Sequence, residues 1–234
     1  NVGIDTYLND KLPFLRAKGA TIIANIYGHS QDEYVELVQR LDEANAADAI
    51  EANLSCPNVH DARKAKGAML VAQDPRCVEE YTRAIRAVTK LPLIVKLTPN
   101  VMDITEPALA AEAAGADALC LINTLLGLAI DAETWRPRLS NIVGGLSGPA
   151  IRPVAVKMVW DAHRVVKIPI IGTGGVCRAE DAIEFLLAGA TAVSVGSMTF
   201  RQPDAAMRVL EGIEGYLVRH EINDVTALIG AMKV

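Results

Sequence analysis

The sequence predicts an α/β fold, an incomplete (β/α)8 TIM barrel with about six βα units present and the first two missing. Apolar residues make up 51% of the 234 residues and aromatic residues only 4%, so aliphatic side chains build the core, as in buried parallel sheets. Helix-period segments alternate with short apolar runs. The turn between them repeats with small residues at 46–50, 114–119 and 188–193, as expected of successive βα units.

The predicted elements follow one another along the whole chain. We expect strands at 21–25, 49–53, 93–98, 116–123, 168–172 and 192–196. We expect helices at about 31–43, 75–89, 104–114, 149–166, 179–188 and 203–220. The first of these helices begins after Ser30, with Glu33 in the capping-box position, and the second begins at Asp74-Pro75. A helix-like segment at 5–16 precedes the first strand, a long loop follows the fourth, and an amphipathic tail at 224–229 ends at Gly230.

Two architectures fit six units without an antiparallel hairpin signal: an open doubly wound sheet, and a barrel that lacks its first two units. The helix-like segment before the first strand would follow a missing strand, which favours the barrel. The chain starts at Asn1 instead of a methionine, so we expect a processed terminus or a longer protein. We interpret residues 1–234 as one domain, since α/β barrels routinely exceed 200 residues.

Composition excludes several classes of function. The net charge is −5 and no Lys/Arg cluster occurs, so nucleic acid and anionic membranes are poor partners. No apolar run approaches the roughly 20 residues of a membrane-spanning helix, and no signal peptide is visible. The four cysteines and four histidines show neither metal-ligand nor disulfide spacing. We therefore expect a cytoplasmic protein without a metal site.

The hexapeptide Asn53-Leu54-Ser55-Cys56-Pro57-Asn58 follows the second strand and is the most unusual stretch of the chain. Two carboxamides can pair with the imide edge of a planar ring, since each offers a donor and an acceptor. The cysteine between them could accept a proton from that ring. The alternative is a strand-to-helix loop with a buried, structural cysteine. The position at the carboxyl end of a strand favours the functional interpretation.

Polar and glycine residues also follow the other strands, where a barrel has its active face. Lys96 ends an apolar run, where a lysine is costly unless it meets an anion or a hydrogen-bond acceptor. The alternative is a lysine that extends to solvent. Glycine stretches at 172–175 and 196 follow the last two strands, where barrels bind phosphate, and 144–149 adds a third. A phosphate site beside a planar heterocycle, a lysine and asparagines matches flavin mononucleotide (FMN).

At this point the motifs are recognisable. Residues 53–58, 95–100 (VKLTPN), 121–127 (LINTLLG), 144–151 (GGLSGPAI) and 170–176 (IIGTGGV) resemble the class 1 dihydroorotate dehydrogenases over almost the whole chain. Segment 123–131 (NTLLGLAID) resembles class 1B, the NAD-linked type, whose catalytic subunit binds FMN. The resemblance implies oxidation of dihydroorotate to orotate in pyrimidine biosynthesis.

The resemblance also implies roles for individual residues. Cys56 is the base that takes a proton from C5 while hydride passes from C6 to flavin N5. The residues implied to hold the pyrimidine are Asn53, Asn58, Asn123 and Thr124. The residues implied to line FMN are Asn25, Asn53, Lys96, Ile122, Gly148, Gly174, Gly175, Gly196 and Ser197. An unperturbed thiol has a pKa of about 8.5, so a cysteine base predicts activity that rises with pH.

Class 1B membership implies a partner polypeptide. Electrons would continue to a separate subunit that carries FAD and a 2Fe–2S cluster, and from there to NAD+. This sequence has no cysteine cluster for iron–sulfur binding. The family pairing suggests a homodimeric core flanked by two such electron-transfer subunits, a heterotetramer.

Two departures from the family pattern bear on activity. The family has two more βα units before Asn1, with a lysine and a substrate loop, and without them we expect weak FMN binding and little turnover. The lid loop at 59–74 carries AMLVAQ where the family has a glycine-rich segment. The alternatives are another FMN barrel that reduces pyrimidines, such as that of dihydropyrimidine dehydrogenase, and an inactive truncated remnant.

Overall fold

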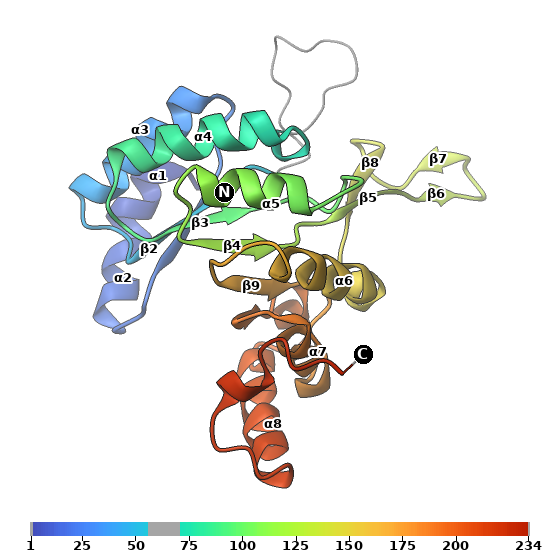
Figure 1. Cartoon of the computed structure of the whole chain (residues 1–234). Helices are drawn as coiled ribbons and strands as arrows, with labels where there is room; N and C mark the ends of the chain where they lie inside the picture. The colour runs from blue at the N-terminus through green and yellow to red at the C-terminus, as the bar shows by residue number, and fades with distance from the viewer. Residues whose placement is uncertain (1, 56–70, 234) are drawn as a thin grey trace.

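Six parallel strands form a curled sheet, half of a barrel, in the computed structural model, which describes residues 2–55 and 71–233 (Figure 1). The spatial order is β1-β2-β3-β4-β9-β10, so consecutive βα units lie side by side. The strands are β1 (Ile23–Ile26), β2 (Ala49–Asn53), β3 (Leu93–Lys96), β4 (Ala118–Leu121), β9 (Ile170–Thr173) and β10 (Ala192–Ser194). The predicted βα units and the barrel architecture are confirmed.

A helix follows each strand, and helix 179–188 has the predicted bounds. The helices are α3 (Gln31–Glu43), α4 (Pro75–Val88), α5 (Thr105–Ala113), α6 (Arg152–His163), α7 (Ala179–Ala188) and α8 (Ala205–Arg219). Before β1 the chain is helical through α1 (Gly3–Thr6), the π-helical turn η1 (Tyr7–Lys11) and α2 (Leu12–Ala17). Short 3-10 turns are η2 (Val71–Gln73), η3 (Pro149–Ile151), η4 (Ser197–Phe200) and η5 (Val225–Leu228).

Local capping fixes where the helices begin. The Ser30 hydroxyl accepts from the Glu33 N–H at 3.3 Å, as predicted, and Asp74 accepts from the Arg76 N–H at 3.0 Å. The Glu33 carboxylate instead accepts from the His29 N–H at 2.6 Å, one residue before the helix cap. The carboxylate still satisfies a backbone donor at the amino end of α3, which stabilises that end of the helix.

The two faces of the sheet have different roles. One face packs against the helices through a large aliphatic core that includes Ile50, Leu93 and Ile170. The other face forms the inside of the half-barrel, where Ala49, Ile94 and Cys120 make a small separate cluster. Because side chains alternate along a strand, residues two positions further along point to the same inner face. This alternation brings polar side chains from several strands to the inner face at the strands' carboxyl ends.

The long loop after β4 differs from the prediction. Residues 125–146, called the arm below, form two small antiparallel sheets: β5 (Leu125–Leu128) with β8 (Val143–Leu146), and β6 (Ile130–Asp131) with β7 (Arg136–Pro137). Figure 1 shows the arm projecting away from the parallel sheet. The expectation of a chain without antiparallel hairpins is therefore wrong. Strands β5 (LLGL) and β8 (VGGL) carry leucines and glycines instead of alternating polar and apolar residues, and β6 and β7 have two residues each, so no period-two pattern marks the arm.

In the part of the chain that the structure describes, none of the helices combines the length and the apolar character needed to cross a membrane.

Candidate functional site

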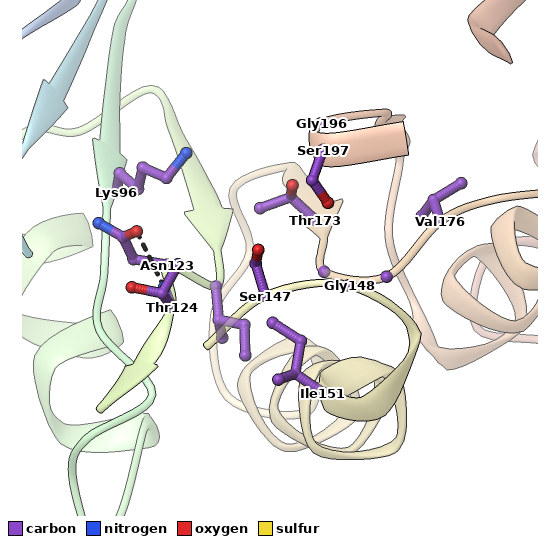
Figure 2. A pocket seen from close by; sticks show the side chains of 13 residues that line it. Lys96, Asn123, Thr124, Ser147, Gly148, Ile151, Thr173, Val176, Gly196 and Ser197 are labelled. Atoms are coloured by element: carbon purple, nitrogen blue, oxygen red, sulfur yellow. Dashed lines mark hydrogen bonds between the residues drawn. The ribbon is translucent and has the colours of Figure 1, made fainter. Parts of the chain in front are cut away.

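A cleft opens at the carboxyl ends of β3, β4, β9 and β10, the end where barrels carry their active sites (Figure 2). Its lining residues come from the strand ends and the loops that follow them. They are Lys96, Ile122, Asn123, Thr124, Ser147, Gly148, Ile151, Thr173, Gly174, Gly175, Val176, Gly196 and Ser197.

The cleft has two chemically different sides. Lys96, Ile122, Asn123 and Thr124, which follow β3 and β4, form what we call the amide wall. The glycine wall consists of Gly148, Gly174, Gly175 and Gly196, with the hydroxyl groups of Ser147 and Ser197 beside them. In Figure 2 the Lys96 amine and the Asn123 amide lie on one side of the cleft, and Ser147, Gly148 and Ser197 lie on the other.

Lys96 is held by a carboxylate on the neighbouring strand. Its Nζ lies 3.3 Å from Oε1 of Glu51, and the two side chains are 20% and 13% exposed. Burial lowers the pKa of the Lys96 amine, whereas the charges of Cys120 and Glu51 raise it, and the net shift is upward. Burial, followed by the Glu51 charge, raises the pKa of the Cys120 thiol to about 12, so that thiol is neutral at pH 7. Glu51 is therefore the carboxylate that pairs with the Lys96 ammonium group and adds to the upward shift of its pKa.

The asparagines of the site bind each other. Asn123 Nδ2 donates to Asn53 Oδ1 at 3.1 Å and to Ser55 Oγ at 2.7 Å. Ser55, which is 1% exposed, donates in turn to Asn53 Oδ1 at 2.9 Å. Asn123 Oδ1 accepts from the Thr124 N–H at 2.9 Å. This network fixes both amides and leaves Asn53 Nδ2 and the Thr124 hydroxyl as the donors best placed to meet a ligand.

A second asparagine network ties the arm to the cleft. Asn100 Nδ2 donates to the Thr124 carbonyl at 3.0 Å, and Asn100 Oδ1 accepts from the Leu126 N–H at 3.0 Å. A Cβ at Gly145, on the opposite strand of the arm, would lie 2.4 Å from Thr124 Oγ1. Glycine is therefore required at 145 for the arm to approach Thr124 this closely.

The glycine wall needs its glycines. Gly148, Gly174 and Gly175 have φ angles of +93°, +138° and +78°, which residues with a Cβ rarely adopt. A Cβ at Gly175 would lie 2.6 Å from the Gly148 carbonyl oxygen, so the two loops meet through bare backbone. Gly196 faces open space, with no heavy atom within 4 Å of its Cβ position. Such uncovered backbone beside hydroxyl groups suits a phosphate group, so these residues fit the phosphate end of FMN.

The cleft brings together most of the predicted site residues. Nine of them line it: Lys96, Ile122, Asn123, Thr124, Gly148, Gly174, Gly175, Gly196 and Ser197. Asn53 joins them through its bond to Asn123. Asn25 lies on β1 and donates through Nδ2 to Glu51 Oε1, away from the lining. Cys56 and Asn58 lie outside the described residues, as does most of the predicted lid at 59–74.

Sequence reasoning did not single out several residues of the site. Ser147, Ile151, Thr173 and Val176 line the cleft, and Ser55 and Glu51 lie directly behind its polar groups. Ser147 and Thr173 lie inside the glycine stretches at 144–149 and 172–175, and this position could have marked them as residues of the cleft. The alternation of β2, in which Glu51 and Asn53 share a face, could have indicated Glu51.

The fold and the site together define a class of protein: a parallel α/β barrel with a polar, glycine-lined cleft at the ends of its strands. A family model described as Dihydroorotate dehydrogenase matches residues 1–217. The chain belongs to the dihydroorotate dehydrogenase family, an oxidoreductase family.

Individual relatives agree with this assignment. The chain is 52% identical to the protein named Dihydroorotate dehydrogenase B (NAD(+)), catalytic subunit, of Trichlorobacter lovleyi, over 100% of this chain and 75% of that protein. It is 48% identical to the protein of the same name in Caldicellulosiruptor bescii, over 100% of this chain and 76% of that one. The resemblance to the NAD-linked type is confirmed.

A solved structure supports the fold. The crystal structure of DHODH from Eimeria tenella in complex with ferulenol superposes with a TM-score of 0.75. The match covers 97% of this chain and 66% of that one, at 24% sequence identity. At this identity the likeness establishes the architecture of the half-barrel alone.

Proposed function

We propose that this chain, as a single FMN-binding domain, oxidises dihydroorotate to orotate in pyrimidine biosynthesis. The observation that carries the proposal is the cleft, in which a partly buried cation and fixed amides face a wall of bare glycine backbone. The names of the relatives support the substrate, since they are dihydroorotate dehydrogenases. No observation favours the alternative of uracil reduction.

Each wall has its own part in the proposed reaction. Gly148, Gly174, Gly175, Gly196 and Ser197 hold the phosphate end of FMN, and Lys96 and Ile122 lie beside its ring. When bound, FMN supplies the acceptor for the hydride that leaves C6 of dihydroorotate.

The amides and the cysteine act on the pyrimidine. The pyrimidine ring is oriented by Asn53, Asn58, Asn123 and Thr124. Two residues, Asn53 and Asn25, also contact the FMN cofactor. The Cys56 thiolate accepts the proton from C5, which completes the two-electron oxidation with the hydride. Lys96, protonated at neutral pH, stabilises negative charge at the ring.

The electrons require a further carrier. The word "subunit" in the relatives' names supports a partner chain. We propose that this partner carries FAD and a 2Fe–2S cluster, passes electrons to NAD+, and flanks a homodimeric core in a heterotetramer.

The decisive experiment is anaerobic addition of dihydroorotate to the chain reconstituted with FMN. Bleaching of the flavin absorbance near its visible maximum is the expected result, at the low rate expected of a chain without the first two βα units. A chain that binds FMN but is bleached by dithionite and not by dihydroorotate would contradict the substrate assignment.

Substitution of the base tests the proton step. Cys56→Ser should slow flavin reduction by at least about 100-fold, the usual scale for losing a general base, because the hydroxyl is far less acidic. Orotate affinity should stay within a few-fold, since serine preserves the shape of the side chain. Equal reduction rates for both proteins across the pH range would exclude Cys56 as the base.

A further inference from the structure

Glu51 is a partly buried carboxylate at the site, and the reaction proposed above gives it no part. It lies on the inner face of β2, with its side chain 13% exposed. Its Oε1 accepts a hydrogen bond from Asn25 Nδ2 on β1 and pairs with Lys96 Nζ on β3 at 3.3 Å. Two neighbouring strands thus converge on a single carboxylate oxygen.

Glu51 stands behind Lys96 as seen from the cleft. Lys96 lines the cleft and Glu51 does not, although the two side chains touch. In the part of the chain that the structure describes, Glu51 is the only carboxylate that forms an ion pair with Lys96. A lysine side chain has four flexible bonds, so an anchored ammonium group loses freedom that a solvated one keeps.

The neighbouring groups carry no charge that could replace either member of the Glu51–Lys96 pair. Asn25 on β1 does not titrate, and Cys120 on β4, which pairs with Lys96 in the sheet register, is a neutral thiol at pH 7. A charge buried to this degree is costly unless it has a partner. Each charge of the pair therefore stabilises the other.

We propose that Glu51 is a positioning residue that holds the Lys96 ammonium group against the cleft and sets the charge that Lys96 presents to a bound ring. The proposal rests on the FMN site proposed above. Glu51 does not line the cleft, so it acts on a bound ring only through Lys96.

Glu51→Gln isolates the charge from the shape. Glutamine keeps an oxygen that can accept from Asn25 and Lys96 but carries no charge. The burial that lowers the pKa of Lys96 remains, and of the two groups that raise it, Cys120 and Glu51, the carboxylate is gone, so the pKa should fall. Below that lowered pKa the cleft would face an unpaired cation, and above it a neutral amine.

The first readout needs no cofactor. Side-chain NMR of 15N-lysine-labelled protein, with Lys96 assigned by its loss in Lys96→Met, gives the pKa of Lys96 directly. We expect a downward shift in Glu51→Gln and none in Glu79→Gln, a matched control whose carboxylate pairs with Arg83 on the outside of α4. An unchanged Lys96 pKa in Glu51→Gln would overturn the proposal whether or not FMN binds.

The second readout connects the pair to the cofactor. The reduction potential of bound FMN, measured against pH, should acquire in Glu51→Gln a break at the pH where Lys96 titrates by NMR. A smooth profile identical to that of the unsubstituted protein would also overturn the proposal. Failure of the unsubstituted protein to bind FMN would instead count against the proposed function and leave the NMR result interpretable.

Glu51→Asp covers the case in which the glutamine variant does not fold. It restores the charge one methylene further from Lys96, so the pKa of Lys96 should stay closer to its original value than in any uncharged variant. A Lys96 pKa in Glu51→Asp as low as that of an unpaired buried lysine would contradict the role of the charge.

Discussion

The two walls of the cleft are built on opposite principles. The amide wall is made of side chains that are held by partners outside the lining: Lys96 by Glu51, and Asn123 by Asn53 and Ser55. The glycine wall is made of backbone, and there the absence of side chains lets two loops meet and leaves space at Gly196. Substitutions on the first wall should therefore disturb chemistry, and substitutions on the second should disturb cofactor retention. Each prediction below tests that division.

The largest effect is expected from Lys96→Met on the amide wall. Flavin reduction by dihydroorotate should slow about 100- to 1,000-fold, the usual scale for removing one group that stabilises developing charge. Stopped-flow absorbance measures this rate. FMN affinity should change much less, because the glycine wall is intact.

The same substitution should destabilise the fold by about 3 kcal/mol, because it leaves Glu51 buried without its cation. The pKa of Lys96 is raised, so the stability from this pair is present at neutral pH and is lost as pH rises through that raised value. Adding Glu51→Gln should recover most of the stability measured by urea unfolding but not the reduction rate. Recovery of the rate by the double substitution would show that Lys96 has only a structural role.

Gly175→Ala tests the glycine wall. Its Cβ would lie 2.6 Å from the Gly148 carbonyl oxygen at a φ of +78°, so the loops must separate. A left-handed conformation costs a residue with a Cβ roughly 1–2 kcal/mol, and the clash adds to it. We expect the dissociation constant for FMN to rise at least about tenfold, while the reduction rate at saturating FMN stays within a few-fold.

Two glycines provide matched controls. Gly196→Ala adds a Cβ to open space, but a φ of −101° with a ψ of −107° lies outside the regions that residues with a Cβ favour, so the free energy of unfolding should fall by roughly 1–3 kcal/mol while FMN binds less tightly. Gly215→Ala, inside α8 and away from the cleft, should stabilise the helix by up to about 1 kcal/mol without changing FMN affinity. Equal FMN affinity in Gly175→Ala, Gly196→Ala and the unsubstituted chain would refute a phosphate site at this wall.

The sequence predicted the glycine wall better than the amide wall, and the reason is physical. A glycine with a positive φ is visible in sequence because no other residue fits there, so Gly174 and Gly175 could be placed from the motif alone. Hydrogen bonds between side chains of different strands depend on register, which the sequence does not state. Ser55, although it lies inside the hexapeptide at 53–58, and Glu51 were therefore given no role from the sequence.

The parallel sheet and the arm show the same contrast at the level of the fold. The central strands β2, β3, β4 and β9 are mostly buried, and the helices α3 and α4 begin at side-chain caps, so composition and caps marked this part of the sheet. The arm exposes large apolar side chains such as Trp135, at 86%, and its short strands bury no face of their own. Burial produces the periodic pattern that sequence reasoning depends on, and the arm lacks it.

The smallest effect is expected from Ser55→Ala, behind the amide wall. The Ser55 hydroxyl bonds both Asn53 and Asn123, at 2.9 Å and 2.7 Å, but the Ser55 carbonyl also accepts from Asn123 at 3.3 Å and remains in the variant. Because the amides are held less firmly, the binding free energy of dihydroorotate should weaken by about 1 kcal/mol. This corresponds to roughly a fivefold rise in KM with kcat nearly unchanged. Steady-state kinetics with FMN saturating gives both constants.

Ser30→Ala is the matched control for that prediction. It removes the hydroxyl that caps α3 and should cost about 1 kcal/mol of stability without any change in KM. A rise in KM shared by both variants would mean that general destabilisation, and not the orientation of Asn53 and Asn123, produces the effect. A rise in KM confined to Ser55→Ala would show that Asn53 and Asn123 must be fixed before the pyrimidine binds. The amide wall would then depend on oriented side chains, whereas the glycine wall depends on bare backbone.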